Sequence, residues 1–183
     1  MWSPELYLAA WRYAAEMHGE QKVPGTQLPY VVHVAAVTME VMTALAQSSR
    51  TENADLAVQC ALLHDVIEDT PASYADVSAR FGVAVADGVL ALTKDKTLPT
   101  KSAQMADSLT RIRQQPREVW SVKLADRITN LQTPPSHWDA AKIVAYRVEA
   151  QTILAALGEA DGGLAARLQE KIGRYPGGSN GGW

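Results

Sequence analysis

Residues 60–70 read CALLHDVIEDT, an apolar run that carries an imidazole and a carboxylate side by side at His64 and Asp65. An ionised carboxylate that is buried without a partner costs several kcal/mol. A divalent metal ion shared with other ligands removes that cost, and imidazole and carboxylate groups both bind such ions. The stretch therefore predicts a metal site built on a largely buried helix.

Two further segments carry groups that complete a ligand set. Upstream, residues 29–33 read PYVVH and end in His33, and downstream, residues 122–130 read VKLADRITN and contain Asp126 in apolar surroundings. A lone histidine in an apolar helix is more often a hydrogen-bonded core residue, and an acid pair at a helix end is more often solvated. The order His, His-Asp, Asp, with both aspartates among apolar residues, favours a shared metal over those readings.

Spacings of four residues place further polar groups beside these ligands. Glu68 lies four residues after His64, Asp69 four after Asp65, and Asn130 four after Asp126. Side chains four apart are neighbours on one face of a helix. We expect the first two pairs to stack on adjoining helical faces, with one end holding metal and the other meeting water.

The pattern of apolar residues and breakers predicts an all-α fold. Ser3-Pro4-Glu5 is typical of a helix start, Pro71 ends a helix, and Gly82 separates two short ones. No stretch alternates with a period of two, and no internal repeat is found. The expected helices cover 3–18, 29–47, 53–67, 73–81, 83–93, 105–113, 118–131, 139–157 and 164–172, with 94–100 as a polar loop.

Composition limits the classes of protein that the chain could be. Its 183 residues, of which 47% are hydrophobic, suffice for one core and hence a single domain. A net charge of −3 argues against binding a nucleic-acid backbone. The acidic, amphipathic N-terminus predicts neither a signal peptide nor a membrane span. The single cysteine, Cys60, fits a reducing compartment, so we expect a cytoplasmic protein.

The combination of these motifs resembles the small alarmone hydrolases of the HD superfamily and the hydrolase domain of the bifunctional Rel/Spo enzymes. The matching segments are residues 28–33, 61–70, 81–82, 92–96 and 122–131, within a region from about Ala10 to Tyr146. The resemblance implies an HD-domain helical bundle, which we place at residues 1–175, followed by a flexible tail at 176–183. The synthetase half of the bifunctional relatives is not expected in this chain.

The resemblance also implies a reaction and roles for residues. The reaction is hydrolysis of the 3′-pyrophosphate of guanosine tetra- or pentaphosphate, giving GDP or GTP, with one Mn²⁺ per active site. The metal ligands would be His33, His64, Asp65 and Asp126. Glu68 and Asp69 would be the catalytic acids that orient and deprotonate water, and Asn130 would lie beside the ribose and 3′-phosphate. Only His18 and His137 remain outside the motif, so a mononuclear site is favoured.

The basic residues expected to bind substrate differ from those of the family that the chain resembles. Members commonly carry an Arg-Lys pair after the glutamine of the first loop, but here Gln21-Lys22 is followed by Val23-Pro24, so only Lys22 remains. Phosphate neutralisation then falls to other basic residues, although each alone is more typical of a solvated charge. An adenosine alarmone is therefore an open alternative. The expected substrate-binding residues are Asn130, Lys22, Lys94, Lys96, Lys123 and Tyr146, with Lys101 and Arg127 as further basic candidates.

Two other functions remain open at this stage. An HD phosphohydrolase acting on another nucleotide or phosphate ester would keep the metal without needing the acid pair and Asn130. A non-catalytic regulatory module would keep the fold alone. Core or partner-surface candidates are Trp2, Trp11, Trp120 and Trp138, and with five tryptophans in the chain some would seal a subunit contact in a homodimer.

Overall fold

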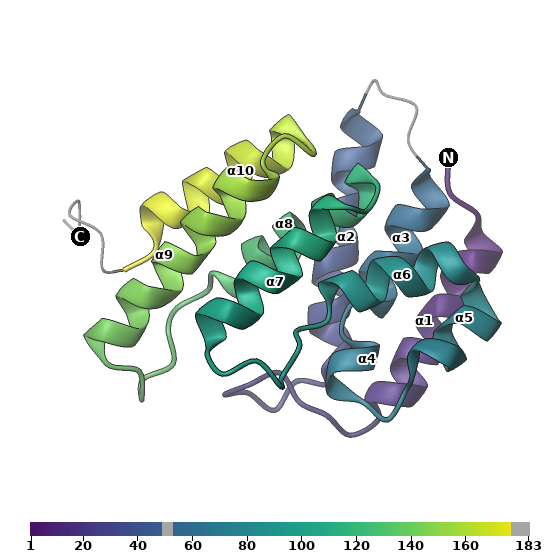
Figure 1. Ribbon diagram of the computed structural model, residues 1–183, viewed down its shortest axis with the longest axis horizontal. Helices are drawn as coiled ribbons and strands as arrows, with labels where there is room; N and C mark the ends of the chain where they lie inside the picture. Colours follow the sequence, from purple (N-terminus) through teal and green to yellow (C-terminus); the bar gives the residue numbers. More distant parts are fainter. Residues whose placement is uncertain (49–52, 177–183) are drawn as a thin grey trace.

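Figure 1 shows a computed structural model of the protein, which describes residues 1–48 and 53–176. Within those ranges the chain is all-α, as predicted, and its one β-type contact is an isolated bridge between Lys22 and Pro29. The helices are α1 (Pro4–His18), α2 (Val31–Gln47), α3 (Ala54–Leu63), α4 (Val66–Asp69), α5 (Tyr74–Phe81), α6 (Val83–Leu92), α7 (Lys101–Arg113), α8 (Arg117–Asn130), α9 (Ala140–Leu157) and α10 (Gly162–Arg174).

Helix α3 forms the centre of the bundle. All of its residues except Asp55 are buried, as expected for a helix that is apolar on all sides. It packs against α1, α2, α6 and α8, and α8 in turn packs against α2 and α10. Helices α9 and α10 lie side by side at one end of the molecule (Figure 1). The start of α2, the end of α3 and the middle of α8 therefore approach one another inside the core.

Local capping explains most of the helix boundaries. Ser3 caps α1 with Pro4 at the first helical position, and Ser73 and Asp76 form a reciprocal capping box at α5. Gly82 has a φ of 88°, which favours glycine, and it separates α5 from α6. Helix α7 begins at Lys101, earlier than the predicted residue 105, because the Thr100 side chain accepts a hydrogen bond from the amide of Ala103.

One predicted helix is broken in the structure. The helix expected at 53–67 ends at Leu63, and His64 and Asp65 form a turn before the short α4. The His64 ring nitrogen Nδ1 lies 2.8 Å from the carbonyl oxygen of Ala61. The side chain thus hydrogen-bonds to a backbone carbonyl in the last turn of α3. The prediction of one continuous helix through these residues was therefore wrong, although the amide of Asp69 still donates to the carbonyl of Asp65 at 2.9 Å, which keeps this pair one helical turn apart.

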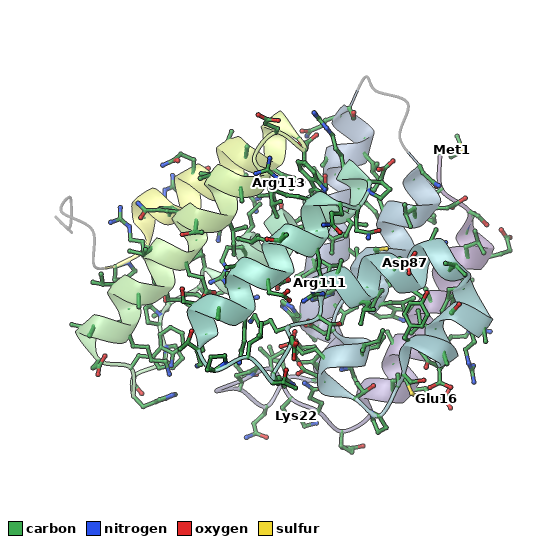
Figure 2. All side chains as sticks on the ribbon, viewed as in Figure 1. Met1, Glu16, Lys22, Asp87, Arg111 and Arg113 are labelled. Atoms are coloured by element: carbon green, nitrogen blue, oxygen red, sulfur yellow. The ribbon has the colours of Figure 1, made fainter. Side chains whose placement is uncertain are left out.

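Charged side chains lie mostly on the outside of the bundle, as Glu16 and Lys22 do in Figure 2. Among the described helices, none combines the length and apolar character needed to cross a bilayer. The predicted flexible tail lies outside the described residues from position 177 onward, so it stays a prediction.

Candidate metal centre

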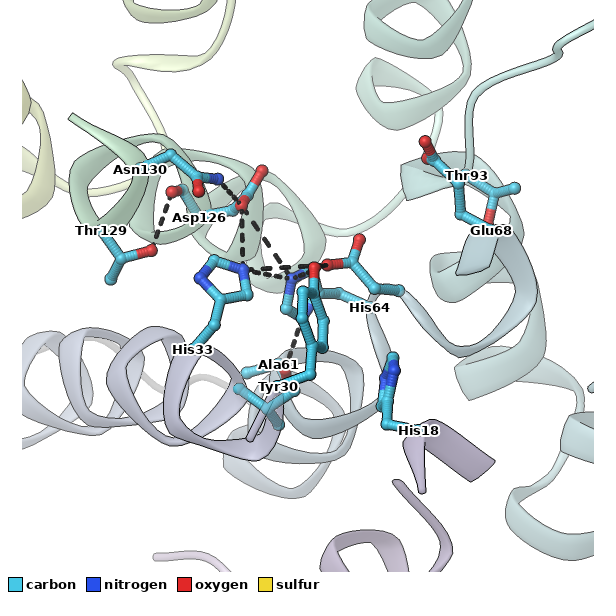
Figure 3. A network of polar contacts seen from close by, with 12 residues as sticks. His18, Tyr30, His33, Ala61, His64, Glu68, Thr93, Asp126, Thr129 and Asn130 are labelled. Atoms are coloured by element: carbon cyan, nitrogen blue, oxygen red, sulfur yellow. Dashed lines mark hydrogen bonds and ion pairs between the residues drawn. The ribbon is translucent and has the colours of Figure 1, made fainter. Parts of the chain in front are cut away.

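Four predicted ligands meet at the junction of three segments. His33 comes from the first turn of α2, His64 and Asp65 from the turn between α3 and α4, and Asp126 from α8 (Figure 3). The Nε2 atoms of the two histidines are 3.3 Å apart, and Asp126 Oδ1 lies 3.5 Å from His33 Nε2 and 4.0 Å from His64 Nε2. Asp65 Oδ2 lies 2.9 Å from His64 Nε2 and 3.7 Å from His33 Nε2.

The donor atoms of this cluster fit a divalent cation. One ligand atom each from His33, His64 and Asp126 lie within 4.8 Å of one another, and all three side chains are almost completely buried. Asp65 approaches both imidazoles but is not part of that mutually close group of three. Two imidazoles and two carboxylates leave coordination positions for water and a phosphate oxygen on an octahedral ion.

The orientation of His64 supports this assignment. Its Nδ1 faces the Ala61 carbonyl, an acceptor, so Nδ1 carries the proton and Nε2 presents a lone pair when the ring is neutral. That lone pair points toward His33 Nε2 and two carboxylates. A group of acceptors that face one another in a buried site requires a cation between them, either a proton or a metal ion.

The pKa values of the clustered residues also indicate that the site favours a positive charge. Burial disfavours the charged form of His64, but Asp65 and Asp126 outweigh it and raise the pKa of His64 to about 9. Burial would raise the pKa of Asp126, but Lys123 and the two histidines lower it well below its usual range. The pKa of Asp65 is likewise lowered, because His64 outweighs the cost of burial.

Two residues predicted to contact substrate, Lys123 and Asn130, both contact Asp126 in the structure. Lys123 is buried and its Nζ lies 3.0 Å from Asp126 Oδ2, and Asn130 donates from Nδ2 to Asp126 Oδ1 at 2.5 Å. Each carboxylate oxygen of Asp126 therefore has its own partner, with Oδ1 also facing the imidazoles. These contacts fix the orientation of the carboxylate and balance its charge.

The acid pair lies apart from the imidazoles. Figure 3 shows Glu68 beside Thr93, away from the His33 and His64 rings. Its Oε2 accepts a hydrogen bond of 2.9 Å from the backbone amide of Lys94. Asp69 is more exposed and lies 3.7 Å from the Nζ of Lys96, which also donates to the Glu68 carbonyl at 2.7 Å.

The remaining predicted substrate residues are spread around this region. Lys22 lies in the loop after α1, exposed and 3.9 Å from Glu20. Tyr146 is half-buried on α9, with the Arg127 guanidinium 4.3 Å from its ring centre, and burial raises its pKa to about 12. Arg127 is itself buried and paired with Glu149, so it is not a solvated phosphate ligand.

Sequence reasoning missed Tyr30 as a site residue. Its hydroxyl donates to Asp65 Oδ2 at 2.5 Å, and the buried His18 ring packs against it with ring centres 4.7 Å apart. His18 Nδ1 lies 2.8 Å from the amide oxygen of Gln21. The available signal was spacing, because Tyr30 precedes His33 by three residues and Gln21 follows His18 by three.

The sequence matches a family model and several proteins of known activity. A family model described as "HD domain" matches residues 10–163. Guanosine-3′,5′-bis(diphosphate) 3′-pyrophosphohydrolase MESH1 from Danio rerio is 29% identical over 174 residues, covering 92% of this chain and 93% of that protein. The MESH1 protein from Drosophila melanogaster is 30% identical over 169 residues, covering 90% and 91%.

A solved structure gives a matching comparison in three dimensions. It is that of a metazoan orthologue of SpoT that hydrolyses ppGpp, and it superimposes with a TM-score of 0.82 at 27% sequence identity. The match covers 97% of this chain and 99% of the other. The likeness therefore extends over nearly the whole fold and is not confined to one motif.

Proposed function

Because the chain belongs to the HD-domain family, we propose that it hydrolyses the 3′-pyrophosphate of guanosine tetra- and pentaphosphate to give GDP or GTP and pyrophosphate. The observation that carries this proposal is the pairing of a buried His33-His64-Asp126 cluster with a separate acid pair on α4. The two MESH1 relatives carry this activity in their names, and each aligns with nearly the whole length of the chain.

The proposed ligands are His33, His64, Asp65 and Asp126, holding one Mn²⁺ per active site. A divalent cation bound there would supply Lewis-acid polarisation of a phosphate oxygen and acidify a water molecule. The residues of the chain supply the rest. Tyr30, Lys123 and Asn130 hold the two aspartates in place, and burial of the cluster excludes competing water.

Glu68 and Asp69 are the proposed proton acceptors. Water attacks the phosphorus linked to the 3′-oxygen, its proton passes to the acid pair, and the bond from phosphorus to the 3′-oxygen breaks. The departing 3′-oxygen takes up the proton that the acid pair accepted and becomes a hydroxyl, and the other product is pyrophosphate. A carboxylate base adjacent to a polarised water suits this step.

The proposed substrate contacts are Asn130, Lys22, Lys94, Lys96 and Tyr146. Lys123 is better suited to holding Asp126, since its ammonium group is buried against that carboxylate. Lys96 reaches both the acid pair and solvent, which places a positive charge where an anionic substrate meets α4. The cytoplasmic location and the homodimer remain predictions.

The proposal is tested by pyrophosphate release from a panel of nucleotides in the presence of Mn²⁺. The panel contains guanosine and adenosine 3′-pyrophosphate alarmones and deoxynucleoside triphosphates. We expect cleavage of the guanosine alarmones, with pyrophosphate as the released product. Turnover of only the adenosine alarmone would change the base assignment. Silence on both alarmones with turnover of a deoxynucleotide would replace the proposal by the broader phosphohydrolase function.

A further inference from the structure

Among the described residues, the group that holds the carboxylate of Glu68 belongs to the backbone and not to a side chain. Its partner is the amide of Lys94, which follows Thr93 at the end of α6. The position of this donor is therefore set by the path of the backbone where α6 ends. Whatever holds that end of α6 also orients Glu68.

Arg111 on α7 holds the end of α6. Its Nη1 donates to the carbonyl of Leu90 at 2.5 Å and to that of Ala91 at 3.1 Å, and its Nη2 donates to the carbonyl of Thr93 at 2.8 Å. Asp107, one turn earlier on α7, accepts from Arg111 Nε at 2.8 Å and fixes the guanidinium plane. The last carbonyls of a helix lack helical partners, and a planar guanidinium satisfies several of them at once.

One peptide unit connects Arg111 to Glu68. The carbonyl of Thr93 and the amide of Lys94 belong to the same planar trans peptide, so they point in opposite directions. Arg111 binds the carbonyl side, and Glu68 binds the amide side. A rotation of this peptide would break both hydrogen bonds, and donation to the carbonyl strengthens the amide as a donor.

Other contacts from α7 hold the same segment. The buried Ser108 donates to the carbonyl of Ala91 at 3.0 Å, and Gln104 donates to the carbonyl of Leu98 at 3.0 Å. Between these two anchors, Lys96 reaches the Glu68 carbonyl and Asp69. The loop that holds the acid pair is thus attached to α7 at both ends.

We propose that Arg111 is a positioning residue that fixes the Glu68 carboxylate through the Thr93–Lys94 peptide. This inference rests on the proposed function, in which Glu68 is a proton acceptor. The described contacts of Arg111 are to the end of α6 and to Asp107, and not to the proposed metal ligands. Its loss therefore lowers kcat, while the affinity for metal stays unchanged. A rise in the KM for the alarmone would report Lys94 and Lys96, the proposed substrate contacts on the same loop.

The matched control is Arg113 on the same helix. It lies two residues from Arg111, on the opposite face of α7, and it is exposed (Figure 2). Its guanidinium lies 6.0 Å from the centre of the Trp120 ring. Arg113→Gln removes the same charge without touching α6. Arg111→Lys keeps the charge but cannot span three carbonyls with a planar fork.

The first experiment measures kcat, KM and Mn²⁺ affinity for Arg111→Gln, Arg111→Lys and Arg113→Gln. We expect kcat to fall about tenfold to a hundredfold in the two Arg111 variants, with Arg113→Gln equal to wild type. In a Glu68→Gln background, Arg111→Gln should reduce the residual rate by less than about twofold, because the group it positions is already lost. An equal loss in both backgrounds would overturn the proposal, as would an unchanged kcat.

The second experiment is independent of activity and records the ¹⁵N–¹H resonance of the Lys94 amide. It should shift in both Glu68→Gln and Arg111→Gln and stay in place in Arg113→Gln. A Lys94 resonance that does not respond to Arg111→Gln would overturn the connection. If the wild-type protein cleaves no alarmone, the proposed function fails, and the Lys94 resonance still decides whether Arg111 orients Glu68.

Discussion

The hydroxyl of Tyr30 donates a hydrogen bond of 2.5 Å to Oδ2 of Asp65, the same oxygen that lies 2.9 Å from His64 Nε2. Burial and the charge of Asp65 raise the pKa of Tyr30 above its ordinary value, so the phenol remains a donor. Tyr30 directly precedes α2, and Asp65 directly precedes α4. This contact therefore fixes two helix starts relative to each other at the cluster.

Replacement of Tyr30 by phenylalanine should weaken the metal site without unfolding the protein. The ring still packs in the core, but Asp65 loses the donor that orients it. We expect the affinity for Mn²⁺, measured by calorimetry, to fall about tenfold to a hundredfold. The control is Tyr74→Phe, which removes a partly buried hydroxyl that donates to Asp87, between α5 and α6. Equal affinities in the two variants would contradict a role for Tyr30.

Metal binding should release a proton near neutral pH. In the metal-free protein the pKa of His64 is about 9, so the ring is protonated at pH 7 and must lose that proton before Nε2 binds metal. Mn²⁺ affinity should therefore rise about tenfold per pH unit from pH 7 to 9. Calorimetry in two buffers of different ionisation enthalpy should count about one proton, also in the control His137→Gln.

The raised pKa of His64 also makes the stability of the metal-free fold depend on pH. Because the folded-state pKa of His64 lies above its ordinary value, protonated His64 stabilises the metal-free fold at acidic and neutral pH, and this contribution is lost as the pH rises through about 9. A proton count of zero at pH 7, with an affinity that is flat up to pH 9, would contradict this account.

A methyl group added at Gly88 should destabilise the core. A Cβ there would lie 2.8 Å from the Cys60 sulfur and 2.9 Å from Val119 Cγ2, where α6 meets α3 and α8. We expect Gly88→Ala to lower the free energy of unfolding by about 1–3 kcal/mol in urea denaturation. Gly173→Ala is the control, since its Cβ would meet none of the described atoms within 4 Å and helix propensity favours alanine. A larger loss in the control would refute the packing argument.

Cys60 should be inert in the folded protein. Burial raises the pKa of its thiol to about 12, so the reactive thiolate is nearly absent at pH 8. Ellman's reagent should therefore react only after addition of denaturant. Rapid reaction of the native protein would show that the α3–α6 contact opens readily.

The positions of the metal-binding candidates could be predicted because each lies in an apolar segment. His64, Asp65 and Asp126 are polar residues where the helical pattern requires apolar ones, and His33 opens a helix with a buried face. Polar residues at positions where the pattern calls for apolar ones indicate that these side chains form one site together. The helix boundaries followed from caps and breakers such as Ser3 and Gly82.

The geometry around those residues could not be predicted in the same way. The break after Leu63 depends on a hydrogen bond from the His64 ring, which no propensity expresses. The partners of Lys96 and Arg111 are fixed by tertiary packing, whereas Lys123 pairs with Asp126 three residues further along the same helix. A lysine near a motif looks the same in the sequence whether it binds substrate or a carboxylate. A backbone donor such as the Lys94 amide cannot be recognised from the sequence, because almost every residue carries one.

Bound Mn²⁺ and alarmone turnover, measured side by side in Asp126→Ala and Glu68→Gln, separate the two halves of the site. The buried cluster is proposed to bind metal, and the acid pair to accept the proton. We therefore expect Asp126→Ala to lose both metal and turnover, whereas Glu68→Gln keeps its metal and loses about a hundredfold or more in kcat. Full turnover in Glu68→Gln, or undiminished metal binding in Asp126→Ala, would contradict this division of roles.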